Sequence, residues 1–160
     1  MTTLDSKIFG PLFGDSEINE LLTDEAYVRA LVEVEAALAK AEARLGVIPS
    51  SAAEQICGVT QRNKIDVAAL AKGTARSGFP IIALVQEIRK AVGGEAASYV
   101  HWGATTQDIM DTANSLQLRA VVGLFKTRIV EIARDPGALS NRHRVTVLAG
   151  AACALWVDAG

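Results

Sequence analysis

Aromatic side chains, cysteines and clusters of basic residues are scarce in this sequence. Phe, Trp and Tyr make up 5% of a chain that is 50% hydrophobic, so its apolar content is mostly Ala, Val, Leu and Ile. Aliphatic residues of this kind suit close helix–helix packing. The net charge is −2, and no dense Lys/Arg patch offers an electrostatic surface to nucleic acid or to an anionic membrane. We therefore expect a small molecule or another protein as the partner.

The two cysteines, Cys57 and Cys153, fit no metal-ligand spacing with each other or with the two histidines, so no metal site is expected. So few cysteines indicate a reducing compartment. The first residues lack the cationic start and apolar core of a signal peptide. The longest apolar run, residues 145–157, is shorter than the roughly 20 residues of a membrane span. These features predict a cytoplasmic protein.

The length of 160 residues fits one ordinary domain or a piece of a larger one. Residues 1–14 mix glycine and proline with scattered apolar residues, and an arm without regular structure is expected there. Thr23, followed by two carboxylates, is typical of a helix cap. Apolar residues then recur at spacings of three and four over residues 27–45, which predicts a long helix ending at Gly46.

Three further helices are predicted upstream of residue 94, and strand patterns do not recur. Ser51 opens the first of them through a capping-box sequence. Asp66 caps the second. The third begins at Pro80, whose missing N–H costs nothing in a first turn, and ends at Gly93. Only residues 98–102 are expected to be extended.

Polar chemistry is concentrated in residues 98–111, SYVHWGATTQDIMD. Thr106 is the predicted cap of a following long helix, which should run to Arg134 and break at Pro136 and its neighbours. The apolar stripe of this helix is too wide to be stable alone and requires partners on more than one side. The stripe residues are Ile109, Ala113, Leu116, Ala120, Leu124 and Ile132.

The donor groups at this helix start could bind an anion. If Thr106 is the cap, the backbone N–H groups of Gln107 and Asp108 point back toward the loop. The hydroxyls of Thr105 and Thr106 lie beside them, and the set suits a carboxylate or a phosphate. Gly103 lets the backbone come close to a ligand.

A simpler interpretation is stronger when these residues are taken alone. His101 could act on a bound anion, because its pKa allows either protonation state near neutral pH. However, a lone His beside Trp102 is more often a packed or capping residue. Asp108 and Asp111 are more simply first-turn carboxylates that favour the helix dipole.

The run VHWGATTQDIMDTA, residues 100–113, resembles the first signature region of the fumarase/aspartase superfamily. It takes the H-x-G-x-T-S-x-D-x-x-D-T form of adenylosuccinate lyases and bacterial 3-carboxy-cis,cis-muconate cycloisomerases. Thr106 replaces the usual Ser and keeps its hydroxyl. The upstream segments GFPIIALVQEIRKAVG and LVEVEAALAKAEARLGVIP look more like the cycloisomerase branch, and the likeness covers nearly all of residues 9–150. The matching residues are His101, Gly103, Thr105, Asp108, Asp111 and Thr112.

The resemblance implies an all-α fold whose small N-terminal helical domain leads into the first long helix of a bundle. The corresponding divisions are residues 1–104 for the N-terminal helical domain, 105–150 for the start of the central bundle, and 151–160 for an aberrant or truncated tail. Full-length members are homotetramers whose active sites combine signature regions of different subunits. Residues 98–111 would then be one wall of a shared site.

The implied chemistry needs neither a metal nor an organic cofactor. In the cycloisomerase, a carboxylate of 3-carboxy-cis,cis-muconate adds to a double bond of the same molecule and gives 4-carboxymuconolactone, a step of protocatechuate degradation. The substrate class is therefore a small di- or tricarboxylate. By motif position, His101 is the anion-binding or proton-relay residue and tentatively catalytic. The substrate-binding residues are Thr105, Thr106 and Gln107, and the structural residues are Gly103, Asp108 and Asp111.

The sequence departs from the family after residue 150. Residues 141–150, NRHRVTVLAG, approach the second signature, but Cys153 stands where its catalytic His belongs. We expect an altered reading frame or a truncation there, which leaves a fragment that is inactive alone and lacks its acid and base. His143 is not a substitute for the missing His. The alternatives are an adenylosuccinate lyase-like enzyme and a non-catalytic helical module that binds anions or assembles.

Overall fold

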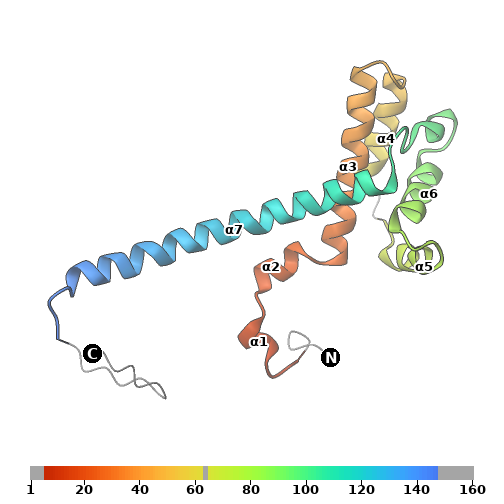
Figure 1. The fold of residues 1–160 in the computed structure, drawn as a ribbon. Coiled ribbons are helices and arrows are strands. Elements are labelled where there is room, and N and C mark those ends of the chain that lie inside the picture. Colours follow the sequence, from red (N-terminus) through yellow and green to blue (C-terminus); the bar gives the residue numbers. More distant parts are fainter. Residues whose placement is uncertain (1–5, 63–64, 148–160) are drawn as a thin grey trace. The chain divides into compact units, whose positions relative to one another are not determined.

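The computed structural model describes residues 6–62 and 65–147 (Figure 1). Over these ranges the chain forms seven α-helices and one 3-10 helix without any strand, so the predicted all-α class is confirmed. The chain groups into two compact units, Met1–Val122 and Gly123–Gly160. The predicted division at residue 104 stays a prediction. The expected tail at residues 151–160 lies outside the described residues.

The starts of the first three helices are set by local signals, a proline for the first and side-chain caps for the next two. Helix α1 spans Gly10–Phe13 and α2 spans Ser16–Leu21. The expectation of an irregular arm is wrong at α1, because the proline in its first turn is already set for helical backbone. Thr23 caps α3 (Asp24–Arg44) as predicted, since its hydroxyl accepts a hydrogen bond from the N–H of Ala26 at 3.1 Å.

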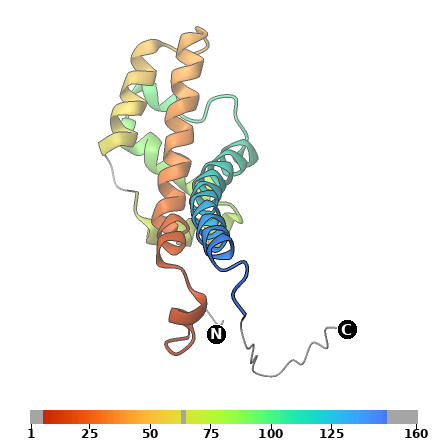
Figure 2. The same ribbon diagram turned by 90° about the vertical axis from the view of Figure 1, so that its left-hand side faces the viewer.

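The next three helices pack as the middle of the first unit. Helix α4 (Ser50–Arg62) begins two residues earlier than a cap at Ser51 predicts, and Ser51 therefore lies inside its first turn. Helices α5 (Val67–Ser77) and α6 (Pro80–Val92) match the predicted starts. Figures 1 and 2 show α3 and α4 running side by side, and α5 packs against α6.

One apolar core holds this unit together. It is built from α3, α4 and α6, and it extends to Val100 in the loop and Ile109 in the last helix, which are 1% and 2% exposed. The loop between α6 and the last helix is therefore anchored on both sides by burial of apolar surface. The most buried side chains of this core are Leu31, Ile56, Ile81, Leu84, Ile88, Ile109 and Val100.

Of residues 98–102, which were expected to be extended, the first two instead end a 3-10 helix, η1 (Glu95–Tyr99), and the next two form a turn. Gly93 and Gly94 have φ values of 65° and 56°, which lets the chain leave α6 and turn at once into η1. Val100, directly after η1, has extended backbone. The turn packs η1 against α4 and α6. Tertiary packing thus overrides the weak local preference of residues 98–102.

The last helix, α7 (Thr106–Arg142), is longer than predicted, because Pro136 lies inside it rather than ending it. A proline costs about 3 kcal/mol in a helix interior but removes only one N–H, and the flanking residues keep helical backbone. Along α7, burial is confined to its first half, at Ile109, Ala113 and Val121. From Phe125 onward the apolar side chains of α7 are exposed within this chain, as expected of a helix whose packing partners are other chains or segments. None of the described helices combines the length and apolar character of a membrane span.

Candidate active-site loop

The start of α7 is closed by a reciprocal cap. The hydroxyl of Thr105 accepts a hydrogen bond from the N–H of Asp108 at 3.3 Å, and the Asp108 carboxylate accepts from the Thr105 N–H at 2.9 Å. The same carboxylate oxygen also accepts from the Thr105 hydroxyl at 2.8 Å. Thr105 is therefore the cap, and the expectation that Thr106 caps the helix is wrong by one residue. The reason is that Asp108 stands three residues after Thr105, which is the capping-box spacing.

Two of the side chains that were predicted to bind an anion are already hydrogen-bonded within the protein. Thr105 is engaged by Asp108, and the side-chain amide of Gln107 donates to Asp111 at 2.6 Å. Hydrogen bonds from the backbone and the side chain of Thr105 lower the pKa of Asp108. Asp108 thus stays ionised at neutral pH and places a negative charge at the positive end of α7.

Replacing Thr105 by Ala should lower the free energy of unfolding by about 1 kcal/mol at neutral pH, the usual value of a lost helix cap. Because folding lowers the pKa of Asp108 below 3.8, the stabilisation is complete above that pH. It is lost as the pH falls through the lowered folded-state pKa. The difference between the wild type and Thr105→Ala should therefore become smaller in acid, where only the hydrogen bond from the Asp108 N–H to the Thr105 hydroxyl remains as a cap. Urea unfolding at neutral and acid pH measures this.

Thr112→Ala is the matched control, because the Thr112 hydroxyl only donates to the carbonyl of Asp108 within the helix, at 2.7 Å. Its effect should stay within about 0.5 kcal/mol at either pH. Equal losses in the two variants would contradict the assignment of the cap.

His101 faces a buried carboxylate. Its Nδ1 lies 2.7 Å from Oε1 of Glu35 in α3, and the two side chains are 15% and 1% exposed. Glu35 is 2% exposed as a residue and is buried among apolar core residues. Lone carboxylates are rarely found in such a place, since burial of an unpaired charge is costly. The hydrogen bond to the imidazole offsets part of the cost of burying this carboxyl group.

The backbone of His101 is held in an uncommon conformation. Its φ is 60°, the one positive value at a non-glycine residue in the described ranges. The Arg89 guanidinium donates from Nη2 to the Val100 carbonyl at 3.0 Å, which fixes the preceding peptide. Gly103, with φ of 67°, turns the chain toward α7. A residue in this region persists only where its surroundings determine it, and such positions cluster at functional sites.

His101 interacts with three carboxyl groups, those of Glu35, Glu42 and Asp108. Burial raises the pKa of Glu35, while His101 and Arg89 oppose that rise. Burial also raises the pKa of Glu42, and the charge of Glu35 adds to it. Among the described side chains, Oε2 of Glu42 is buried without a hydrogen-bond partner. Asp108 is stabilised in its charged form by His101 as well. His101 is thus the one residue that acts on the pKa of all three carboxyl groups.

Glu35, Glu42 and Arg89 were not predicted from the sequence. A signal for two of them was present: Glu35 and Glu42 are seven residues apart, and each follows a residue of the apolar stripe of α3 by four positions. They therefore share the helix face that is buried. A carboxylate on a buried face predicts a polar partner from another element. The sequence does not say which element supplies it.

The predicted site residues fall into two groups. His101 is drawn inward to α3, whereas the other residues lie in or beside the first turn of α7. Thr106 is half-buried there, and among the described residues its hydroxyl has no hydrogen-bond partner. Burial and the charge of Asp111 raise the pKa of Tyr27, which places Asp111 near α3. No group of three or more potential metal ligands occurs among the described residues.

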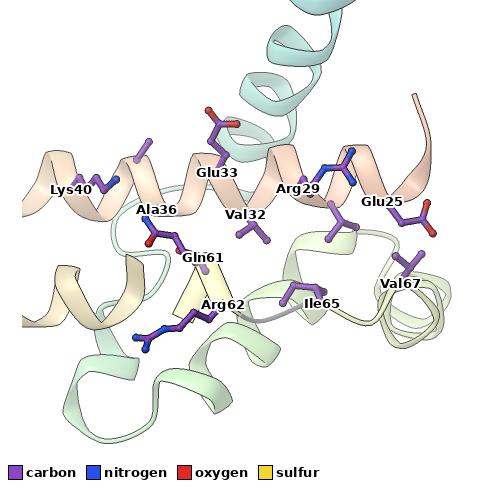
Figure 3. Close-up of a pocket in the computed structure, with 13 residues that line it drawn as sticks. Glu25, Arg29, Val32, Glu33, Ala36, Lys40, Gln61, Arg62, Ile65 and Val67 are labelled. Carbon is purple, nitrogen blue, oxygen red and sulfur yellow. The ribbon is translucent and has the colours of Figure 1, made fainter. Parts of the chain in front are cut away.

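A separate hollow of about 750 Å³ lies beside α3 (Figure 3). The loop of residues 98–111 contributes nothing to it. Side chains of α3 line one wall, and residues around the end of α4 lie across from them. Acidic and basic groups both occur at this hollow, so its charge favours no one class of ligand. The charged residues are Glu25, Arg29, Glu33, Lys40 and Arg62.

Curated proteins similar to this chain include several enzymes whose names refer to small carboxylic acids. The chain is 37% identical over 150 residues to 3-carboxy-cis,cis-muconate cycloisomerase of Acinetobacter baylyi, covering 91% of this chain and 33% of that protein. It is 35% identical to nitrosuccinate lyase of Streptomyces davaonensis, covering 92% of this chain and 32% of that protein. Cycloisomerases of other bacteria recur among the relatives. No protein-family model matches the sequence.

A solved structure has the same fold. The crystal structure of fumarate lyase from Mesorhizobium sp. BNC1 matches 86% of this chain with a TM-score of 0.81 and 40% identity, and the match covers 32% of that protein. The chain spans about a third of the length of these relatives. Sequence and structure agree on the same superfamily. The chain is homologous to the N-terminal portion of enzymes of the fumarate lyase (fumarase/aspartase) superfamily.

Proposed function

We propose that residues 98–111 form one wall of the active site of a 3-carboxy-cis,cis-muconate cycloisomerase. The observation that carries the proposal is the juxtaposition of His101, on its buried carboxylate, with the first turn of α7. The recurrence of cycloisomerases at 33–37% identity supports this choice of activity. A small di- or tricarboxylate is the substrate class that such a wall suits.

The groups available to a substrate carboxylate differ from the simplest expectation. Asp108 and Thr105 are hydrogen-bonded to each other and are not free to bind a ligand. The N–H groups of Thr106 and Gln107 have no partner within the helix, so the ligand is expected there. The Thr106 hydroxyl lies beside them. When the imidazole of His101 carries a positive charge, it offsets the charge of Asp108, which would otherwise repel an anion. Anion binding should therefore depend on Thr106 and on the imidazole together.

The proposed role in chemistry is stabilisation of charge. In the elimination direction, a proton leaves the carbon next to a carboxylate, and negative charge accumulates on that carboxylate. Donors that are already oriented toward such charge usually supply the largest part of catalysis. In this proposal Thr106, Gln107 and His101 supply those donors. The general base and acid lie outside the described residues, on other segments or subunits of a homotetramer.

The exposed part of α7 supports assembly in the complete protein. In the unit Gly123–Gly160, large apolar side chains are exposed on a helix that a monomer would leave in water, and apolar patches of this kind mark interaction surfaces. These residues are Phe125, Ile129, Val130, Ile132 and Leu139. A bundle formed by several subunits would cover them.

Thr106→Val should weaken binding of 3-carboxy-cis,cis-muconate about tenfold, because it removes one hydroxyl donor to a charged ligand at nearly constant volume. Titration of the purified chain, followed through its backbone amide NMR signals, measures this. Thr112→Val is the matched control, since Thr112 lies further along α7 and donates to the carbonyl of Asp108. Equal affinity in wild type and Thr106→Val would contradict the proposed site.

An absorbance assay separates the candidate functions. It compares this chain with a chimera in which the region after residue 147 comes from the Acinetobacter baylyi cycloisomerase. Consumption of 3-carboxy-cis,cis-muconate by the chimera alone would support the proposal. Consumption of adenylosuccinate or nitrosuccinate instead would reassign the substrate. Turnover of none of them by a folded chimera would favour a non-catalytic anion-binding or assembly module.

A further inference from the structure

We propose that Glu35 is the positioning residue of this site, and that it holds His101 with Nδ1 protonated so that Nε2 is the ring nitrogen presented to the substrate. This inference rests on the proposed function for what Nε2 contacts, but not for the state of the ring. It adds to the site a residue of α3 that lies 66 positions away in the chain.

The geometry favours a carboxylate that accepts from an N–H. A distance of 2.7 Å between Nδ1 and Oε1 is typical of a charge-assisted hydrogen bond. Burial raises the pKa of Glu35, but His101 and the Arg89 guanidinium, which is bound to the neighbouring Val100 carbonyl, both favour its charged form. A carboxylate can only accept, and therefore the proton of this bond belongs to Nδ1. Neutral His101 then has its lone pair on Nε2.

The backbone around His101 also restricts the position of its ring. Val100 before it is 1% exposed and is held by Arg89, and the positive φ of His101 lets the side chain reach inward to Glu35. A histidine fixed by a carboxylate on one nitrogen can bind an anion or take up a proton at the other. The remaining charged groups near the pair are Glu42 and Asp108, and neither is hydrogen-bonded to the ring.

A purely structural role for Glu35 makes a different prediction. In that case the pair would only fill and stabilise the core, and the ring could carry its proton on either nitrogen. A neutral Glu35 donating to Nδ1 would leave the hydrogen on Nε2. The two possibilities differ in the chemical shifts of the ring nitrogens, which makes them separable without any substrate.

The test is ¹⁵N-labelled histidine NMR of the full chain at a pH where the rings are neutral. The chain has two histidines, and the exposed His143 serves as an internal reference. We expect His101 of the wild type to be the Nδ1–H tautomer. In Glu35→Met, which removes the acceptor, His101 should return toward the Nε2–H tautomer that free histidine prefers. Glu42→Met, the same substitution at the neighbouring carboxylate, should leave the tautomer unchanged.

An Nε2–H tautomer in the wild type overturns the proposal, even if Glu35→Met fails to fold. Retention of Nδ1–H in folded Glu35→Met, checked by circular dichroism, overturns it as well. In the chimera, Glu35→Met should lower kcat about 10- to 100-fold, as loss of a partner that orients a histidine does elsewhere. If the tautomer shifts as expected but no tested substrate is consumed, the proposed function fails while the positioning role stands.

Discussion

Replacing Leu84 by Ala should lower the free energy of unfolding by about 3 kcal/mol, within the range found for leucines in protein cores. Leu84 is 0% exposed and lies on α6 among the core residues of the first unit. The variant loses the transfer free energy of the removed methyl and methylene groups, and it also leaves a cavity that rigid helices close only in part. Urea unfolding followed by circular dichroism measures the change.

Ile82→Ala on the same helix is the control. Ile82 is 44% exposed, so its truncation should change the free energy of unfolding by about 0.5 kcal/mol or less. A loss in Leu84→Ala no larger than that of the control would mean that α6 does not pack on this core in solution. Such a result would also remove the support of η1, which follows α6 and leads into the candidate active-site loop.

Replacing Gly73 by Leu should cost about 3 kcal/mol, the upper part of the usual range for overpacking. A Cβ built on Gly73 of α5 would lie 2.4 Å from the Cβ of Ala83 in α6, which is closer than carbon atoms approach. The two helices would have to separate to admit any side chain. The thermal midpoint and the urea midpoint should both fall.

Gly123→Leu is the matched control within α7. A Cβ at Gly123 meets nothing within 4 Å, so the same substitution there should raise helix stability by up to about 1 kcal/mol. Exchange of the two residues, Gly73→Ala with Ala83→Gly, should recover most of the loss of Gly73→Ala alone, because one methyl group then occupies the contact. A similar response of the two glycines to leucine would contradict the close packing of α5 on α6.

The active-site loop was only partly predictable from local sequence. The helix start was foreseen to within one residue, because caps depend on side chains three positions apart, but Thr106 was chosen over Thr105. The correct choice required attention to Asp108, which completes a capping box only with Thr105. Pro136 was expected to end α7, although a helix that continues on both sides tolerates a single lost hydrogen bond.

The pairing of His101 with a carboxyl group could not be predicted from the local sequence. Glu35 was visible as a charge on the buried face of α3, and His101 as the single histidine of the loop. Their pairing depends on where α3 lies relative to η1 and on a positive φ at His101, which no propensity of histidine predicts. Arg89 and Val100 are likewise joined only after α6 and the loop pack together.

The sequence by itself determined the all-α class, the starts of α3, α5 and α6, and the family to which residues 98–111 point. These features are local, because apolar spacing, caps and a contiguous motif act over a few residues. The tertiary structure alone decided which ring nitrogen faces Glu35 and which loop groups are already taken by Asp108 and Asp111. Such contacts join separate elements or depend on particular backbone angles. The packing of the shared core determines where the elements lie and which backbone angles the loop adopts.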